Sequence, residues 1–214
     1  MAEIGSWPEY AKFFAAMMAI VNPVGALPIL INLTASDTEK QRKEISFRAG
    51  VSCFLILVLT LLTGEAILRF FGISIASFRV GGGILILLMA ISMLHAKPSR
   101  VKHTDEELQD SEDKEDVAVV PLATPLLAGP GAISTIILHT QKYASTVHLL
   151  ILGGEILLIA LITWVILRTG PAIAAKLGKT GINIVTRLMG LIMAAVGVEF
   201  IANGLKQLFP VLAG

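Results

Sequence analysis

Long apolar runs constrain the fold of this chain more than any other feature. Six runs of about 20 residues are separated by polar connections, and a helix of about 20 residues crosses the hydrocarbon core of a bilayer. Because lipid offers the backbone no hydrogen-bond partners, each run is expected to be a helix. The sequence therefore predicts an all-α integral membrane protein with transmembrane helices at Ala11–Leu33, Ala49–Arg69, Ile75–His95, Val117–His139, His148–Leu167 and Leu188–Phe209.

Composition agrees with this class and excludes others. Charged residues make up 15% of the chain and the mean hydropathy is +0.78, whereas about a quarter of a soluble domain is charged. A net charge of +1 without a basic stripe gives no reason to expect nucleic acid as a partner. The sequence contains no nucleotide-binding, zincin or serine-hydrolase motif, and its histidines lack metal-ligand spacing. We therefore expect no enzyme activity, cofactor or metal.

The distribution of lysine and arginine predicts an orientation. The connections after the first, third and fifth runs, with the adjoining helix ends, hold 12 of these residues, and the opposite side holds 5. The positive-inside rule then assigns the odd-numbered connections to the cytoplasm. Both termini are expected in the periplasm, on a multi-pass protein of the bacterial inner membrane.

Two halves of the chain carry related features. The first run contains N-P-V-G-A from Asn22, and the fourth contains G-P-G-A from Gly129. Arg79 and Arg187 begin the third and sixth runs, 56 and 57 residues after the proline of the preceding motif. Three helices per half require opposite orientations, so we predict two inverted three-helix repeats, residues 1–96 and 117–214, joined by a charged cytoplasmic linker, residues 97–116.

Proline and glycine in mid-span predict broken helices in the first and fourth runs. Proline lacks a backbone donor and glycine lacks a side chain to shield the break. Two half-helix N-termini would then meet near the midplane, where their free N–H groups attract an anionic group. The predicted substrate-binding residues are Asn22, Pro23, Gly25, Thr124, Gly129, Pro130, Gly131, Ser134 and Thr135. Packing kinks without a ligand remain the alternative interpretation.

Ionisable residues at membrane depth are costly, so each is a functional candidate. Glu155 and Glu199 are the deepest carboxyl groups and are candidates for carrying a coupling proton. Arg79 and Arg187 occupy matching helix starts, where they would gate the path, attract solute or extend to lipid phosphate.

Three stretches closely resemble the MarC family of bacterial inner-membrane proteins: NPVGALPIL from Asn22, FRVGGGILILLMAISML from Phe78, and PLATPLLAGPGAISTII from Pro121. The resemblance covers essentially the whole chain. It implies a six-helix inner-membrane protein and kinship with a superfamily of amino-acid exporters, with archaeal relatives that carry small neutral amino acids.

Two functions remain open from the sequence. The first is a secondary transporter of a small polar solute such as a neutral amino acid, with proton or sodium coupling. The second is a non-transporting membrane protein that acts through helix–helix assembly with a partner. Either one would be surrounded by the lipid bilayer, and either leaves room for a homo-oligomer.

Overall fold

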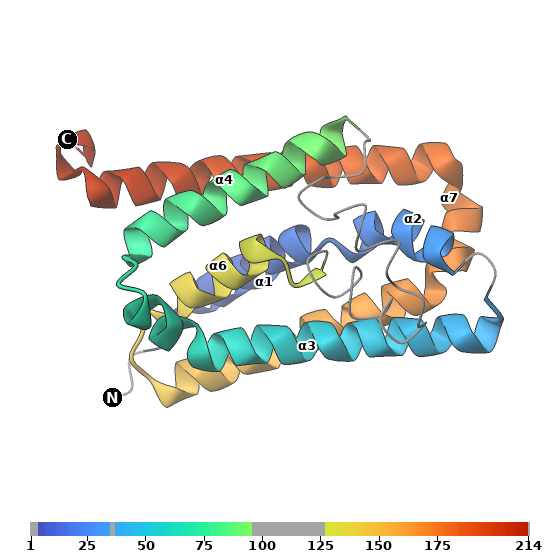
Figure 1. Ribbon diagram of the computed structural model, residues 1–214, viewed down its shortest axis with the longest axis horizontal. Helices are drawn as coiled ribbons and strands as arrows, with labels where there is room; N and C mark the ends of the chain where they lie inside the picture. The colour runs from blue at the N-terminus through green and yellow to red at the C-terminus, as the bar shows by residue number, and fades with distance from the viewer. Residues whose placement is uncertain (1–3, 35–36, 96–126, 214) are drawn as a thin grey trace.

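The computed structural model describes residues 4–34, 37–95 and 127–213, and all regular structure in these ranges is helical. The elements are α1 (Trp7–Val21), α2 (Pro23–Leu33), α3 (Glu39–Phe70), α4 (Ile75–Leu94), α6 (Pro130–Thr140), α7 (Thr146–Leu208) and the 3₁₀ turn η2 (Pro210–Ala213). Gly178 interrupts α7 with a φ of 62° and a ψ of 176°, and there the chain turns back (Figure 1). The predicted linker lies outside the described residues.

Five of the six predicted spans are confirmed as helices long and apolar enough to cross a bilayer. They are Trp7–Ile31, Glu39–Phe70, Ile75–Leu94, Thr146–Gly178 and Thr180–Leu208. The described part of the fourth predicted span is α6, with 11 residues. At 1.5 Å per residue, α6 is about 16 Å long and by itself covers only about half of a ~30 Å hydrocarbon core.

Two helices extend further than their apolar runs. The predicted second span starts at Ala49, but α3 starts at Glu39 behind the N-cap Thr38, whose side chain accepts a hydrogen bond from the Gln41 N–H. Its 32 residues reach about 48 Å. The predicted fifth span ends at Leu167, but its helix continues to Gly178. Hydropathy identifies only the part of a helix that lies inside the hydrocarbon core. Backbone hydrogen bonds and capping residues allow the same helix to extend beyond the core into water.

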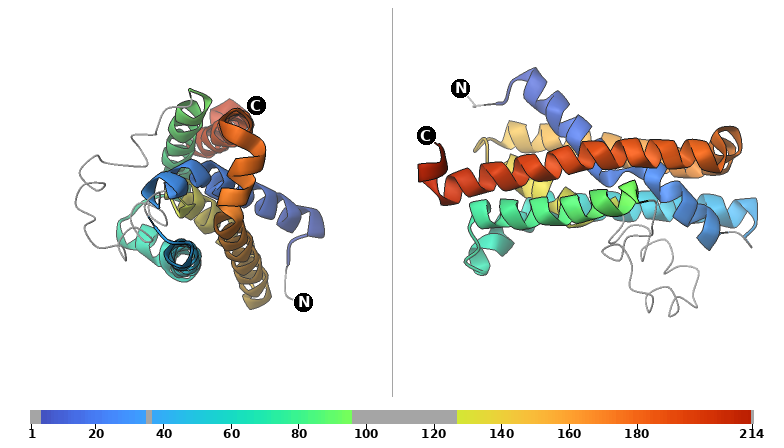
Figure 2. Two further views of the ribbon diagram at one scale, coloured as in Figure 1. Left: turned by 90° about the vertical axis from the view of Figure 1, so that its right-hand side faces the viewer. Right: turned by 90° about the horizontal axis from the view of Figure 1, so that it is seen from above.

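The bundle is built around its N-terminal helices. In Figure 1, α1, α2 and α6 run through the middle, with α3 and the first segment of α7 on one side and α4 and the second segment of α7 on the other. Figure 2 shows α1 crossing the bundle obliquely. The Trp7–Ile31 span is 53% buried, compared with 17–33% for the other four. The largest fully buried side chains are Phe13, Met17, Ile20, Leu27, Leu30, Leu57, Ile86, Met89, Leu127 and Ile136.

Apolar side chains also cover the outside. Leucines of α3 and α7 are highly exposed, for example Leu62 at 70% and Leu150 at 70%. Large apolar surfaces of this kind are unfavourable in water. The outer helices therefore present the surface expected of a chain that faces lipid.

Glycines let α4 and the second segment of α7 pack closely. Gly190, Gly197 and Gly204 recur every seven residues on one face of α7. A Cβ atom added at Gly197 would lie 2.9 Å from the Gly83 carbonyl oxygen, and one added at Gly204 would lie 2.9 Å from the Ala76 carbonyl oxygen. These pairs show that the two helices run antiparallel and that only glycine fits at their contact.

Candidate functional site

The first predicted break is present at Asn22, which separates α1 from α2. Its backbone is left-handed, with a φ of 47°, a conformation that asparagine adopts more readily than most residues. The Asn22 N–H donates to the Met18 carbonyl at 3.0 Å, and its Oδ1 accepts from the Gly25 N–H at 3.1 Å. Pro23 then opens α2, where its missing donor costs little. One residue therefore caps both helices.

At the second predicted break the structure describes the start of a helix, α6; the residues before 127, which would form the preceding half-helix, lie outside the described part of the chain. Gly129 is extended, with a φ of −75° and a ψ of 175°, and Pro130 is the first helical residue. Gly129 has no side chain to cap the N–H groups of the first turn, and it is buried. The N-terminus of α6 therefore begins inside the bundle with backbone donors that its own cap does not satisfy. Thr124 lies outside the described residues.

The two breaks are neighbours in space. A Cβ atom added at Gly131 would lie 3.1 Å from Cγ2 of Ile20, two residues before Asn22, and 2.6 Å from Cγ1 of Ile86 on α4. The start of α6 therefore packs between the end of α1 and the middle of α4. Because Pro23 has no N–H and the Gly25 N–H is capped, α2 offers fewer donors to an anion than α6 does.

The remaining predicted side chains at the breaks are buried. Asn22 is 3% exposed, Ser134 2% and Thr135 0%. Asn22 Nδ2 donates to the Met93 sulfur at 3.6 Å, and the Thr135 hydroxyl donates to the Gly131 carbonyl at 2.8 Å. Their role in substrate binding stays a prediction.

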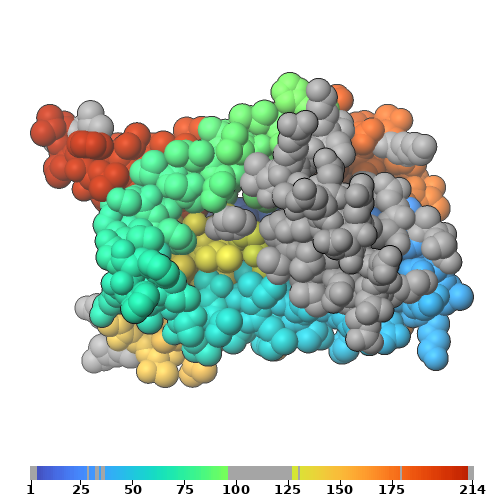
Figure 3. All heavy atoms as spheres, in the orientation of Figure 1, coloured from blue at the N-terminus to red at the C-terminus, as the bar shows by residue number. Residues whose placement is uncertain are grey.

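Ser134 also lines a cavity of about 630 Å³ between α4 and α6. Figure 3 shows α6 (yellow) at the floor of a hollow between α4 (green) and α3 (cyan). The lining is mostly apolar; apart from Ser134 it includes one other hydroxyl, that of Ser77.

A second, more polar cavity of about 680 Å³ opens between α1, α4, the end of α6 and the second segment of α7. Its lining includes residues of α1 and of the last turns of α7, and Figure 1 shows that α1 starts and α7 ends at the same end of the bundle. Two of the predicted coupling or gating residues, Arg79 and Glu199, line it. Its full lining is Lys12, Ala16, Arg79, Leu138, His139, Lys142, Ala195, Val196, Glu199, Phe200 and Asn203. We call this space the charged cavity.

Positive charge dominates the charged cavity. Lys12, Arg79 and Lys142 face a single carboxylate, Glu199, whose Oε1 accepts from Asn203 Nδ2 at 2.8 Å. Arg79 Nε is buried and has no hydrogen-bond partner among the described residues. An unpaired buried donor is costly, so Arg79 is held here without the hydrogen bond that would offset the burial of its Nε.

Hydrogen bonds hold the wall of the charged cavity in position. The hydroxyl oxygen of Tyr10 in α1 lies 2.9 Å from Nδ1 of His148 at the start of α7. Nε2 of His148 lies 2.8 Å from the carbonyl oxygen of His139 at the end of α6. Because a carbonyl only accepts, Nε2 carries the proton and Nδ1 accepts from the Tyr10 hydroxyl. These two hydrogen bonds link α1, α6 and α7 through His148, which is buried with 2% of its surface exposed.

The structure does not bring the other two predicted residues into the charged cavity. Glu155 lies in the first segment of α7, where its Oε2 is buried with no partner in the described ranges. Arg187 is exposed and precedes Gly190, which packs on Met93 at the far end of α4 from Arg79. Arg79 and Arg187 therefore lie at opposite ends of the bundle.

The sequence did not lead us to predict Lys12, His139, Lys142 or Asn203 as site residues. The distribution of basic residues could have pointed to two of them. Three of the five basic residues on the sparsely charged side of the predicted topology, Lys12, Arg79 and Lys142, gather in this cavity.

Comparison with known proteins identifies the family. The model of the MarC family of integral membrane proteins matches residues 7–209. The UPF0056 membrane protein YhcE of Escherichia coli (strain K12) is 43% identical over 204 residues, which cover 95% of each chain. The UPF0056 membrane protein YvbG of Bacillus subtilis (strain 168) is 39% identical over 93% of this chain and 95% of its own length.

An archaeal relative extends the comparison. A UPF0056 membrane protein of Pyrococcus abyssi (strain GE5 / Orsay) is 35% identical over 94% of this chain and 96% of its own length. No solved structure matches this chain. With a family match over almost its full length and relatives of the same size, this multi-pass membrane protein belongs to the MarC family.

Proposed function

We propose that this protein is a secondary transporter of a small polar solute, and that the charged cavity is the entry to its binding site. The observation that supports this most is the cavity itself, which brings together charged residues from both halves of the chain, among them Arg79, Lys142 and Glu199. Its volume of about 680 Å³ lies within the ~300–1,000 Å³ range of small-molecule sites.

The charges favour a zwitterion such as a neutral amino acid. Its carboxylate would bind the guanidinium of Arg79 with Lys12 and Lys142 nearby, since charge-assisted hydrogen bonds of this kind are the strong ones. Its ammonium group would bind Glu199, which Asn203 orients. Deeper in the bundle, the N–H groups at the start of α6 would next donate hydrogen bonds to the carboxylate, because helix N-termini attract anions.

The solute would cross the membrane between two halves that form an inverted repeat. α2 and α6 both begin with a proline after a non-helical residue, Asn22 or Gly129, and they start beside one another. Under this proposal the two halves, residues 1–96 and 117–214, rock against each other around that junction. Glu155, whose buried Oε2 has no partner in the described ranges, would carry a coupling proton.

The test is uptake by purified protein in liposomes under an imposed proton or sodium gradient, screened with small neutral amino acids and with the matching amino alcohols, which lack the carboxylate. We expect uptake of an amino acid and no competition from its alcohol. Loss of one charge-assisted hydrogen bond costs about 1.5–3 kcal/mol, so Arg79→Gln should lower uptake by about 10- to 150-fold.

Arg69→Gln is the matched control. Arg69 lies at the end of α3, is exposed and pairs with Glu65 rather than lining the charged cavity. Its loss should leave uptake unchanged. If folded wild-type protein moves no solute of the panel under either gradient, the transporter proposal is wrong and assembly with a partner becomes the better interpretation.

A further inference from the structure

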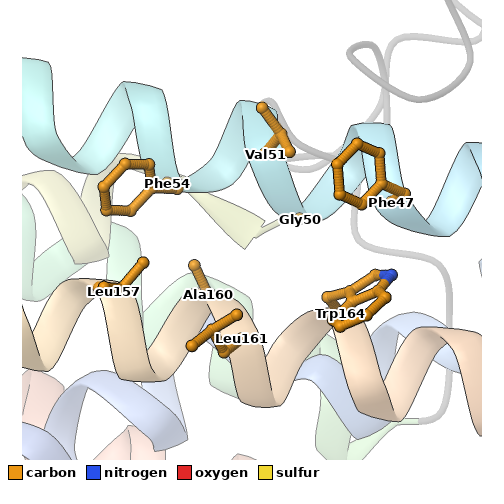
Figure 4. A pocket seen from close by; sticks show the side chains of 8 residues that line it. All are labelled: Phe47, Gly50, Val51, Phe54, Leu157, Ala160, Leu161 and Trp164. Atoms are coloured by element: carbon orange, nitrogen blue, oxygen red, sulfur yellow. The ribbon is translucent and has the colours of Figure 1, made fainter.

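A groove on the outer surface of the bundle suggests a second ligand, independent of transport. It runs between α3 and the first segment of α7, has a volume of about 150 Å³, and is lined by Phe47, Gly50, Val51, Phe54, Leu157, Ala160, Leu161 and Trp164. Figure 4 shows the two rows of side chains facing each other across it. The lining consists of aliphatic and aromatic residues and carries no charge. We call this space the lipid groove.

Close packing at the floor of the lipid groove creates its shape. A Cβ atom added at Gly50 would lie 2.9 Å from the Trp164 Cβ and 3.7 Å from the Ala160 carbonyl, so the two helices touch there. Larger side chains flank the contact and face outward, with Phe47 55% exposed and Leu161 47% exposed. The groove therefore opens to the surroundings of the bundle rather than to its core.

One end of the lipid groove is polar. The rings of Phe47 and Trp164 meet edge to face, 6.1 Å apart, and the guanidinium of Arg168 lies 5.5 Å from the centroid of the Trp164 ring. Trp164 Nε1 is buried without a hydrogen-bond partner among the described residues. Arg168 is exposed and makes no ion pair within 4.0 Å in the described part of the chain, and Glu39 at the start of α3 is a carboxylate close enough to feel its charge.

The positions of these groups along their helices correspond to the headgroup and acyl-chain levels of a phospholipid in the bilayer. Phe47 lies eight residues after the start of α3 at Glu39, or about 12 Å along the helix, and aromatic residues favour this interfacial level of the bilayer. Phe54 and Leu157 continue the groove toward the middle of both helices. Arg168, one turn beyond Trp164, reaches the headgroup level, as long basic side chains do near helix ends.

We propose that the lipid groove binds a phospholipid with an acidic headgroup. One acyl chain lies along the groove from Trp164 toward Phe54, and the headgroup phosphate accepts hydrogen bonds from Arg168. The ring of Trp164, which stacks against the Arg168 guanidinium, forms the wall of the groove at the headgroup end. An apolar surface alone would leave the exposed Arg168 guanidinium without an acceptor, so the charge at one end favours an acidic lipid over a second copy of the protein.

Tryptophan fluorescence tests the proposal directly. The chain has two tryptophans, Trp7 and Trp164, so Trp7→Phe leaves Trp164 as the single reporter. The variant is placed in bilayers that mix unlabelled lipid with a brominated phosphatidylglycerol or a brominated phosphatidylcholine, since bromine quenches tryptophan on contact. One basic residue near a membrane contributes about 1 kcal/mol toward an anionic lipid, so we expect the acidic lipid to occupy the site about fivefold better.

Two further variants in the Trp7→Phe background separate the parts of the site. Arg168→Gln should remove the fivefold preference, whereas Arg69→Gln at the other end of α3 should keep it. Val51→Phe should fill the groove and lower quenching by both lipids, whereas Leu55→Phe, one turn further on α3 and outside the lining, should not.

Three results would overturn the proposal: equal quenching by the two brominated lipids, a preference that survives Arg168→Gln, or quenching that both lipids lose as protein concentration rises. The last result would mean that a second copy of the chain covers the groove.

Discussion

The left-handed junction at Asn22 makes the sharpest prediction about stability. Removing the Asn22 side chain lowers the free energy of unfolding for two reasons. The partly buried Gly25 N–H loses its acceptor, which costs about 1–2 kcal/mol for a cap of this kind. A residue with a Cβ atom must also hold the φ of 47° without the local hydrogen bond of asparagine, at about 1–2 kcal/mol.

Two substitutions separate these terms. Asn22→Ala incurs both costs, so we expect a loss of about 2–4 kcal/mol in the free energy of unfolding. Asn22→Gly loses the acceptor but tolerates the positive φ, so we expect about 1–2 kcal/mol. The difference between the variants, about 1–2 kcal/mol, is the cost of the left-handed backbone.

The measurement is equilibrium unfolding in detergent, followed by circular dichroism at 222 nm, a wavelength that reports helix content directly. Equal stability of the two variants would refute the argument, because it would mean that the junction does not keep its left-handed conformation. Wild-type stability in both would show that the cap itself contributes nothing.

Three further predictions follow from the same structure. A Cβ atom at Gly82 would clash with the Ser134 side chain, while one at Gly81 would meet nothing within 4 Å. Gly82→Ala should therefore lower the free energy of unfolding by about 1–3 kcal/mol, and Gly81→Ala should not lower it in the same detergent assay. If Glu155 carries a coupling proton, Glu155→Gln should abolish gradient-driven uptake and keep counterflow exchange, and normal proton-driven uptake would exclude this role. Reporter fusions should assign the C-terminus to the periplasm and Asp110 to the cytoplasm, and the reverse pattern would contradict the positive-inside assignment.

The sequence by itself determined the class of protein, the helix junction at Asn22 and the helix start at Pro130. Long apolar runs identify spans because the bilayer requires a fixed length of helix. Asn22 with Pro23, and Gly129 with Pro130, specify a helix end and a helix start through local backbone chemistry. Such interactions act between neighbours in the chain, so they can be read without knowing the fold.

The tertiary structure decided which of these features meet. Gly82 looks interchangeable with Gly81 in the sequence, yet only Gly82 faces Ser134 from another helix. Arg79 and Glu199, 120 residues apart in the chain, share one cavity with Lys12 and Lys142, while Glu155 does not reach it. Which residues of different helices come into contact depends on the tilt and rotation of each helix. Packing between glycines and buried side chains sets the tilt and the rotation, and the hydropathy of a single span specifies neither of them.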